Sequence, residues 1–298
     1  MGKALALALI YIKNNVRFIY TFYLPVFWQF SALQGLFSWI VHLMSADTQT
    51  HITPTRIRRR LVLSAGDDLR RCLVCEVREK SVCNAIDDDD LAVLAQASKT
   101  LSFPPGTTLV EEGAPATAFF NVTGGTVKLF KSLPDGRRQI TGFADVGHFL
   151  GLTNAGFYSF GAETVDAVRV CRFSRTRLES LLTDYPQFER RLLEGIADEL
   201  ADAQDQMLLL GRKTARERVA SFLLSRTIQS PCQAKEDETP LVSLPMTRVD
   251  IADFLGLTIE TVSRTISALR REGLIAGTDH HGIRILAPIQ LESLALGQ

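Results

Sequence analysis

The hydrophobic period of the chain changes part of the way along, and this change limits the folds open to it. From about residue 99 to residue 174, short β-type segments alternate with turn signals such as Pro104-Pro105-Gly106. From Tyr185 to about Gly211, apolar residues recur at alternating steps of four and three. The first pattern predicts a sandwich or barrel of short strands, and the second predicts one long helix. We therefore expect an α+β fold, in a chain whose 298 residues are enough for two domains.

The expected strands are residues 101–103, 107–110, 118–122, 126–131, 139–143 and 165–173. Side chains alternate between the two faces of a strand, so the odd-numbered residues of the last strand should share one face. These are Val165, Ala167, Arg169, Cys171 and Phe173.

A run of aspartates, residues 87–90, precedes the strands. Consecutive carboxylates lack the alternate spacing of an EF-hand loop, so the run does not favour calcium. We expect Asp87 to cap a helix whose Leu91, Leu94 and Ala95 face inward.

The long helix carries an apolar seam, which consists of Leu192, Ile196, Leu200, Ala203, Met207 and Leu210. This spacing is typical of a coiled coil, and a helix of this length finds little partner surface on a compact barrel. We therefore expect a parallel homodimer, with packing inside one chain as the alternative. Asp205 lies near the seam and is expected to repel its counterpart in the dimer, unless it points to solvent.

Three of the five cysteines lie close together, at Cys72, Cys75 and Cys83. The two-residue spacing of the first pair lets both thiolates reach one metal centre, so the cluster is a candidate metal site that needs a fourth ligand from elsewhere. Arg70 and Arg71 are expected to favour the thiolate form. A further cysteine, Cys232, lies in the polar stretch 230–240 and is expected to be a free surface thiol.

The last quarter of the chain has the helix and turn signals of a DNA-binding domain. Thr247 and Asp250 have the spacing of a capping box, Gly256 suits a helix end, and Thr258 caps a second helix with a buried face of Val262, Ile266 and Leu269. Two short helices joined at a glycine predict a helix-turn-helix, and residues 273–286 predict a β-wing. The residues expected to contact DNA are Thr258, Glu260, Ser263, Arg264, Ser267 and Arg248.

The overall charge, 33 basic against 33 acidic residues, does not itself indicate nucleic acid. The local charge does, because Arg248, Arg264, Arg270 and Arg271 supply phosphate contacts.

The beginning of the chain differs from the rest. Residues 18–44 contain no charged side chain and are long enough to be a transmembrane candidate. We favour a mis-assigned start, with Met44 as the true initiator, over a membrane anchor. Localisation is accordingly expected to be cytoplasmic, with membrane association only if residues 18–44 are real and inserted.

The order of cysteine cluster, strands, long helix and helix-turn-helix resembles the bacterial CRP/FNR family, which includes the cAMP receptor protein and the fumarate–nitrate reduction regulator, FNR. The resemblance covers about residues 68–290, and its most specific segments are residues 139–143 and 247–264. It implies a β-roll, a dimerisation helix and a winged helix-turn-helix. Glu260, Ser263 and Arg264 match the FNR version of the recognition helix, which implies an FNR-type palindrome, TTGAT-N4-ATCAA.

The resemblance also implies a cofactor. In FNR, three N-terminal cysteines and one β-roll cysteine hold a [4Fe–4S] cluster, and here Cys171 stands at the matching strand position. The seven residues between Cys75 and Cys83 resemble the FnrN-like, oxygen-sensing subgroup. The implied function is an oxygen-responsive regulator of anaerobic and microaerobic genes. Zinc, another effector in the same fold, and a membrane-anchored redox protein remain the alternatives.

The implied partners are double-stranded DNA, a second copy of the chain, and RNA polymerase, which surface loops around residues 131–138 could touch. No cyclic nucleotide is expected, since residues 147–151 and 159–163 lack the Arg-Ser pair of the cAMP-receptor pocket. The sequence shows no recognisable pair of a nucleophile and a general base, so an enzyme is not expected. The expected parts are residues 1–43 (hydrophobic segment), 44–86 (flexible lead-in with the cysteines), 87–183 (β-roll sensor), 184–212 (dimerisation helix) and 213–298 (winged helix-turn-helix).

Overall fold

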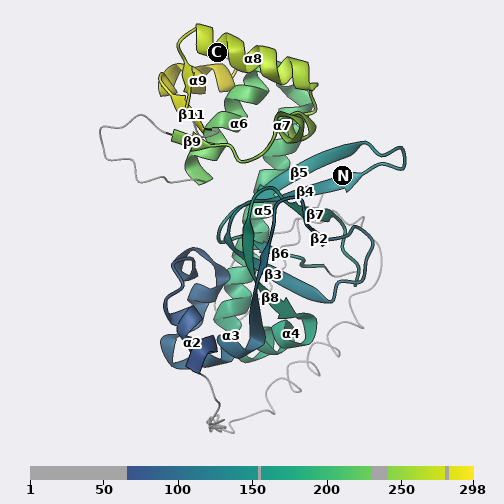
Figure 1. Cartoon of the computed structure of the whole chain (residues 1–298), viewed down its shortest axis with the longest axis vertical. Helices are drawn as coiled ribbons and strands as arrows, with labels where there is room; N and C mark the ends of the chain where they lie inside the picture. Colours follow the sequence, from purple (N-terminus) through teal and green to yellow (C-terminus); the bar gives the residue numbers. More distant parts are fainter. Residues whose placement is uncertain (1–65, 154–155, 230–240, 279–281) are drawn as a thin grey trace, which may run out of the picture. The chain divides into compact units, whose positions relative to one another are not determined.

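The computed structural model describes residues 66–298, apart from residues 154–155, 230–240 and 279–281 (Figure 1). The hydrophobic segment 1–43, the expected start at Met44 and the loop with Cys232 lie outside the described residues. Within the described ranges, no helix is long and apolar enough to cross a membrane.

The segment that carries the first three cysteines is helical or turned. It consists of α2 (Gly66–Leu73), three 3-10 turns, η1 (Arg78–Lys80), η2 (Val82–Ala85) and η3 (Asp88–Asp90), and then α3 (Leu91–Ala97). The sequence predicts a flexible lead-in up to residue 86, but its described part is ordered into these turns from Gly66 onward. Asp87 precedes the η3 turn and does not cap α3, because the aspartates themselves form that turn.

Eight of the described strands form two antiparallel sheets. One has the order β1-β8-β3-β6 and the other β2-β7-β4-β5. The strands are β1 (Ser98–Phe103), β2 (Thr108–Val110), β3 (Ala118–Gly124), β4 (Val127–Ser132), β5 (Arg138–Ala144), β6 (Phe149–Leu150), β7 (Gly161–Thr164) and β8 (Val168–Ser174). The α+β expectation is confirmed. The sequence did not predict β6 and β7, which are short and lack an alternating pattern.

The two faces of β8 pack into different cores. Val168 and Val170 belong to the core that also contains Val122 and Val127. Phe173 belongs to a second core, formed with the helices α2 to α4, and Cys171 packs against it. The shared face predicted for Arg169, Cys171 and Phe173 is therefore confirmed, whereas Val165 and Ala167 precede the strand.

Two helices follow the sheets, α4 (Arg175–Asp184) and α5 (Pro186–Arg212). Pro186 stands at the start of α5, where its missing N–H costs nothing. Leu192 is buried against the second core, but Ile196, Leu200 and Met207 are 42%, 58% and 65% exposed. In the single chain, the middle of the predicted seam is thus a stripe of apolar side chains that are exposed to solvent.

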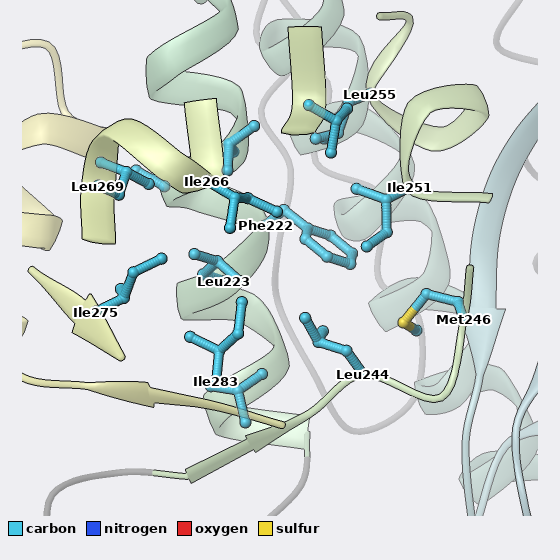
Figure 2. Close-up of a cluster of buried hydrophobic side chains, with 14 of the residues drawn as sticks. Phe222, Leu223, Leu244, Met246, Ile251, Leu255, Ile266, Leu269, Ile275 and Ile283 are labelled. Carbon is cyan, nitrogen blue, oxygen red and sulfur yellow. The ribbon is translucent and has the colours of Figure 1, made fainter. Parts of the chain in front are cut away.

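The C-terminal part consists of α6 (Ala215–Gln229), β9 (Leu241–Ser243), α7 (Arg248–Leu255), α8 (Ile259–Arg271), β10 (Ile275–Gly277), β11 (Gly282–Ile285) and α9 (Pro288–Ala295). Its core is apolar and is formed by side chains of the helices α6 to α9 and of the wing strands, with Phe222 and Leu223 of α6 at the centre (Figure 2). The wing has the strand order β10-β11-β9. The helix-turn-helix and the wing are as predicted, and β9 is an addition.

The turn between α7 and α8 depends on a left-handed residue. Gly256 has φ 60° and ψ 42°, and Thr247 and Asp250 form the predicted capping box at the start of α7. The capping box and Gly256 fix both ends of α7, so they set how α8 leaves the turn.

Gly256→Ala is expected to lower the free energy of unfolding by about 1–2 kcal/mol, the cost of a left-handed conformation for an L-residue. The new Cβ would also lie 3.1 Å from Leu210 Cδ2. Urea unfolding followed by circular dichroism measures the change. Gly211→Ala, in the last turns of α5 where a Cβ meets nothing within 4 Å, is the control and should not destabilise. Equal destabilisation by both would contradict this account of the turn.

Candidate functional site

The four described cysteines surround one pocket. Cys72, Cys75 and Cys83 come from α2, the turn after it and η2, and Cys171 comes from β8 on the facing sheet. The pocket has a volume of about 370 Å³ and is closed on its inner side by Leu91, Leu94 and Phe173. The structure therefore brings the predicted fourth cysteine to the other three across about ninety residues of chain.

Two arginines hold the cysteine-bearing segment in place, Arg71 by bonds to α3 and β1 and Arg78 by bonds within the turns of the segment. The Arg71 guanidinium donates to the Ala95 carbonyl (2.7 Å), the Ser98 carbonyl (2.5 Å) and Thr100 Oγ1 (3.0 Å). Arg78 donates to the Ile86 carbonyl (2.6 Å) and pairs with Asp88. Arg71 lines the pocket as well, whereas Arg70 is exposed outside its lining.

Burial raises the pKa values of three of the thiols. Burial is the main reason that the pKa of Cys83 is raised to about 12. Burial likewise raises the pKa of Cys72 and of Cys171, while the positive charge of Arg71 lowers both. Ionisation of one cysteine also disfavours ionisation of the others, since each of the six pairs among Cys72, Cys75, Cys83 and Cys171 would bring two negative charges close together. Four thiolates at these positions therefore need a positive group among them.

Two polar side chains contact the sulfurs from the sheet. Asn121 Nδ2 lies 3.6 Å from Cys83 Sγ, and Thr100 Oγ1 lies 3.9 Å from Cys171 Sγ. The sequence predicts neither contact. The one signal for the first contact is that Asn121 interrupts the apolar run Ala118–Val122, which marks a buried polar side chain. In the described part of the chain, no three His, Cys, Asp or Glu side chains converge closely enough to hold a single metal ion.

The predicted DNA-contacting residues lie on the solvent side of α8. Val262, Ile266 and Leu269 are buried, and Glu260, Ser263, Arg264 and Ser267 are exposed. The Thr258 side chain caps the helix by accepting from the Thr261 N–H at 3.2 Å. The structure thus presents one polar face of α8 of the kind that enters a major groove.

Arg248 begins α7 and is half-buried. Burial, followed by the nearby charge of Arg270, lowers the pKa of its guanidinium, and its Nη1 has no hydrogen-bond partner. A buried cation without an acceptor is costly, so a phosphate oxygen would be a favourable partner.

The sheet and the helix-turn-helix meet at a polar junction. Lys128 Nζ of β4 bonds Asp250 Oδ1 of α7 at 2.8 Å and Glu163 Oε1 of β7 at 2.9 Å. The carboxylate that binds the β-roll lysine is therefore the one that caps α7. Beside it, Arg226 of α6 is 4% exposed and donates to Asp145 from both nitrogens of its fork.

The C-terminal end of α7 is held in the same way. Gln139 Nε2, from the segment 139–143, donates to the Asp253 carbonyl at 2.7 Å and to the Phe254 carbonyl at 3.1 Å. Gln206 of α5 also donates to the Phe254 carbonyl, at 2.7 Å. Periodicity carries no sign of these contacts, because each joins segments far apart in the sequence.

A second cavity of about 530 Å³ lies between β4–β5, α5 and α6. Three carboxylates of α5 line it, those of Glu199, Asp202 and Asp205. Partial desolvation and the charges of Asp205 and Asp198 raise the pKa of Asp202, against the opposing effect of His148. His148, Lys213 and Arg226 line the same cavity, so its charge is mixed.

A β-roll joined by a long helix to a winged helix-turn-helix defines a DNA-binding regulator. Family models agree: residues 100–185 match a cyclic nucleotide-binding domain, and residues 217–294 match a Crp-like helix-turn-helix domain.

The chain is similar to transcription regulators along most of its length. It is 43% identical to the nitrogen fixation regulation protein FixK of Bradyrhizobium diazoefficiens, over 75% of this chain and 93% of the relative. It is 37% identical to the transcriptional activator protein FnrL of Cereibacter sphaeroides, over 70% of this chain and 85% of that one. The solved structure of FixK2 from Bradyrhizobium japonicum matches with a TM-score of 0.61 and 36% identity, covering 66% of this chain and 96% of that chain. The chain belongs to the CRP/FNR family of transcriptional regulators.

Asp250→Asn tests the junction. Burial alone would raise the pKa of Asp250, but hydrogen bonds from Lys128 and Thr247 outweigh it and hold the pKa below its usual range. At pH 7 the variant should lose roughly 1.5–3 kcal/mol of stability, the value of a hydrogen bond between charged groups. A carboxyl with a lowered pKa stabilises above its unfolded pKa of about 4, and this contribution is lost as the pH falls through the folded pKa.

The measurement is urea unfolding of both proteins between pH 7 and pH 3, and the difference between them should narrow toward pH 3. Asp253→Asn is the matched control on the same helix. Burial and the charge of Asp250 raise the pKa of Asp253, so this variant should not be destabilised. A constant difference between wild type and Asp250→Asn at all pH values would contradict the ion pair with Lys128.

Proposed function

We propose that this regulator responds to oxygen, and that Cys72, Cys75, Cys83 and Cys171 hold a [4Fe–4S] cluster. The observation that carries the proposal is the pocket itself. Cysteines from two distant segments line this pocket, and the same chain carries a helix-turn-helix at its C-terminal end. Four thiolates are the ligand set of a cubane cluster.

The room between the cysteines favours a cluster over zinc. A structural zinc ion touches all four sulfurs at about 2.3 Å and leaves no space between them. The pocket that the four cysteines line has a volume of about 370 Å³, and among the described residues no three His, Cys, Asp or Glu side chains are close enough together for one metal ion. Metal analysis distinguishes the two alternatives, because a zinc site would contain zinc without iron or sulfide.

The cysteine-bearing segment is also the segment that contacts the dimerisation helix. η2, which contains Cys83, packs against α5, and Val82 shares a core with Leu192 at the start of the seam. When bound, the cluster supplies Fe–S bonds that tie this segment to β8 and that are sensitive to oxygen. Holding η2 in place supports α5 where the exposed stripe begins.

The exposed stripe of α5 is the proposed dimer contact. Ile196, Leu200 and Met207 gain most by being covered, because each leaves a large apolar side chain in water. Asp205 stands beside them, and two copies would bring like charges together. Dimerisation is therefore marginal, and support of α5 by the cysteine segment shifts its equilibrium.

The dimer would present two α8 helices to two half-sites one helical turn apart. Arg264 can donate two hydrogen bonds to a guanine, and Glu260 can accept from a cytosine amino group. The proposed target is the palindrome TTGAT-N4-ATCAA. The protein would act in the cytoplasm and recruit RNA polymerase, with the exposed turn between β4 and β5 as one contact.

Cys171→Ala is expected to abolish the cluster, because the sheet supplies no other thiolate to the pocket among the described residues. Iron and acid-labile sulfide in anaerobically purified protein should fall from about four per chain toward zero. Cys232→Ala is the control and should keep the cluster. A full cluster in the Cys171→Ala protein would mean that another group is the fourth ligand.

Arg264→Ala is expected to weaken binding to the palindrome by about 1–3 kcal/mol and to relax the preference at one base pair in each half-site. Arg271→Ala, in the last turn of the same helix, should instead weaken binding to all sequences alike and reduce the salt dependence. Fluorescence anisotropy with the palindrome and with single-base variants separates the two effects. Equal losses on every sequence for Arg264→Ala would contradict a base contact.

A further inference from the structure

Asn121 is the most deeply buried polar side chain at the cysteine pocket. It lies in the middle of β3, is 2% exposed and lines the pocket. Its neighbours on this side of the sheet are aromatic: Phe119 and Phe149 stack with centroids 6.2 Å apart, and Phe173 lies 5.8 Å from Phe149. An amide in such surroundings is costly unless it makes hydrogen bonds.

Structural needs alone do not account for this amide. Its Nδ2 donates to Cys83 Sγ at 3.6 Å, but its Oδ1 has no hydrogen-bond partner. A leucine of similar size would fill the same space without an unsatisfied oxygen. A buried polar group that is only half-satisfied in this way calls for a functional explanation.

The sheet register places Asn121 beside the fourth cysteine. β8 lies between β1 and β3, and Cys171 is paired with Thr100 on one side and with Asn121 on the other. The three side chains form a row across the sheet that faces the pocket. Asn121 therefore sits next to one proposed ligand and donates to another, and so reaches both segments that the pocket joins.

We propose that Asn121 is a positioning residue whose amide donates a hydrogen bond to the sulfur of Cys83 and so sets the redox properties of the bound cluster. This inference rests on the proposed function. A metal-bound thiolate can only accept, so the NH₂ group must face the sulfur. The hydrogen bond orients the Cys83 side chain and stabilises negative charge on its sulfur.

The direction of the effect follows from charge. One-electron reduction adds a negative charge to the cluster and its thiolates, and a hydrogen bond to sulfur favours this more negative state. Removing the donor therefore lowers the midpoint potential. It also makes loss of an electron to dioxygen easier, because the oxidised state is no longer disfavoured by the donor.

The test compares wild type with Asn121→Leu, which keeps the volume and removes the donor. The matched control is Thr123→Val, because Thr123 lines the same pocket from the same strand. Anaerobic redox titration should give a lower midpoint potential for Asn121→Leu only. Its visible absorption should bleach in air about tenfold faster, the change expected for one hydrogen bond to a charged group. If Asn121→Leu does not fold, Asn121→Ser, whose side chain is too short to reach Cys83, carries the same test.

Two failures are distinguishable. Wild-type protein without iron and sulfide would overturn the proposed cluster. Wild-type protein with a full cluster, together with a donor-less variant of unchanged potential and bleaching rate, would overturn the role of Asn121 alone. Equal shifts in Asn121→Leu and Thr123→Val would also overturn it, because they would reflect general disturbance of the pocket.

Discussion

The meeting of four cysteines from two distant segments at one pocket is the constraint on which the proposed site depends, because ionising them together is unfavourable. Cys83 and Cys171 belong to different segments, and burial together with like charge disfavours their ionised forms. Arg71 holds the cysteine-bearing segment on α3 and β1 by hydrogen bonds to the Ala95 and Ser98 carbonyls, and Arg78 fixes the turns of that segment by a hydrogen bond to the Ile86 carbonyl. These bonds bring the cysteines together but do not offset the repulsion that four thiolates would have. A cationic group in the pocket would therefore add much of the energy that holds the segment in place.

The structure connects this pocket to the DNA reader through α5 and the sheets. η2 packs against α5, and α5 ends beside the helix-turn-helix, where Gln206 bonds the last turn of α7. Lys128 and Asp145 fix α7 and α6 to the β-roll. In the proposed switch, a change at the cysteines would reach α8 by way of dimer geometry, because Lys128 and Asp145 hold the helix-turn-helix on the β-roll of its own protomer. The cysteine pocket and the DNA-binding helix lie apart, and charged contacts such as Lys128–Asp250 and Arg226–Asp145 join the domains that carry them.

Much of the fold could be predicted from the sequence because it depends on local patterns. The capping box at Thr247, the left-handed Gly256 and the buried face of α8 follow from residue type and spacing. The position of Cys171 followed from a family resemblance and from strand alternation. The contacts of Asn121, Lys128 and Arg226 could not be predicted, because they join residues more than thirty positions apart. The turns around Cys75 and Cys83 were missed because they depend on packing against α3 and the sheet.

The most direct test follows one sample of the protein before and after air. Sedimentation velocity and DNA anisotropy are measured on anaerobically purified protein with its iron and sulfide quantified, and then again after exposure to oxygen. The account predicts a coloured dimer that binds the palindrome and that loses colour, dimer and affinity together in air. A colourless protein with one zinc per chain, or a dimer whose affinity does not change in air, would contradict it.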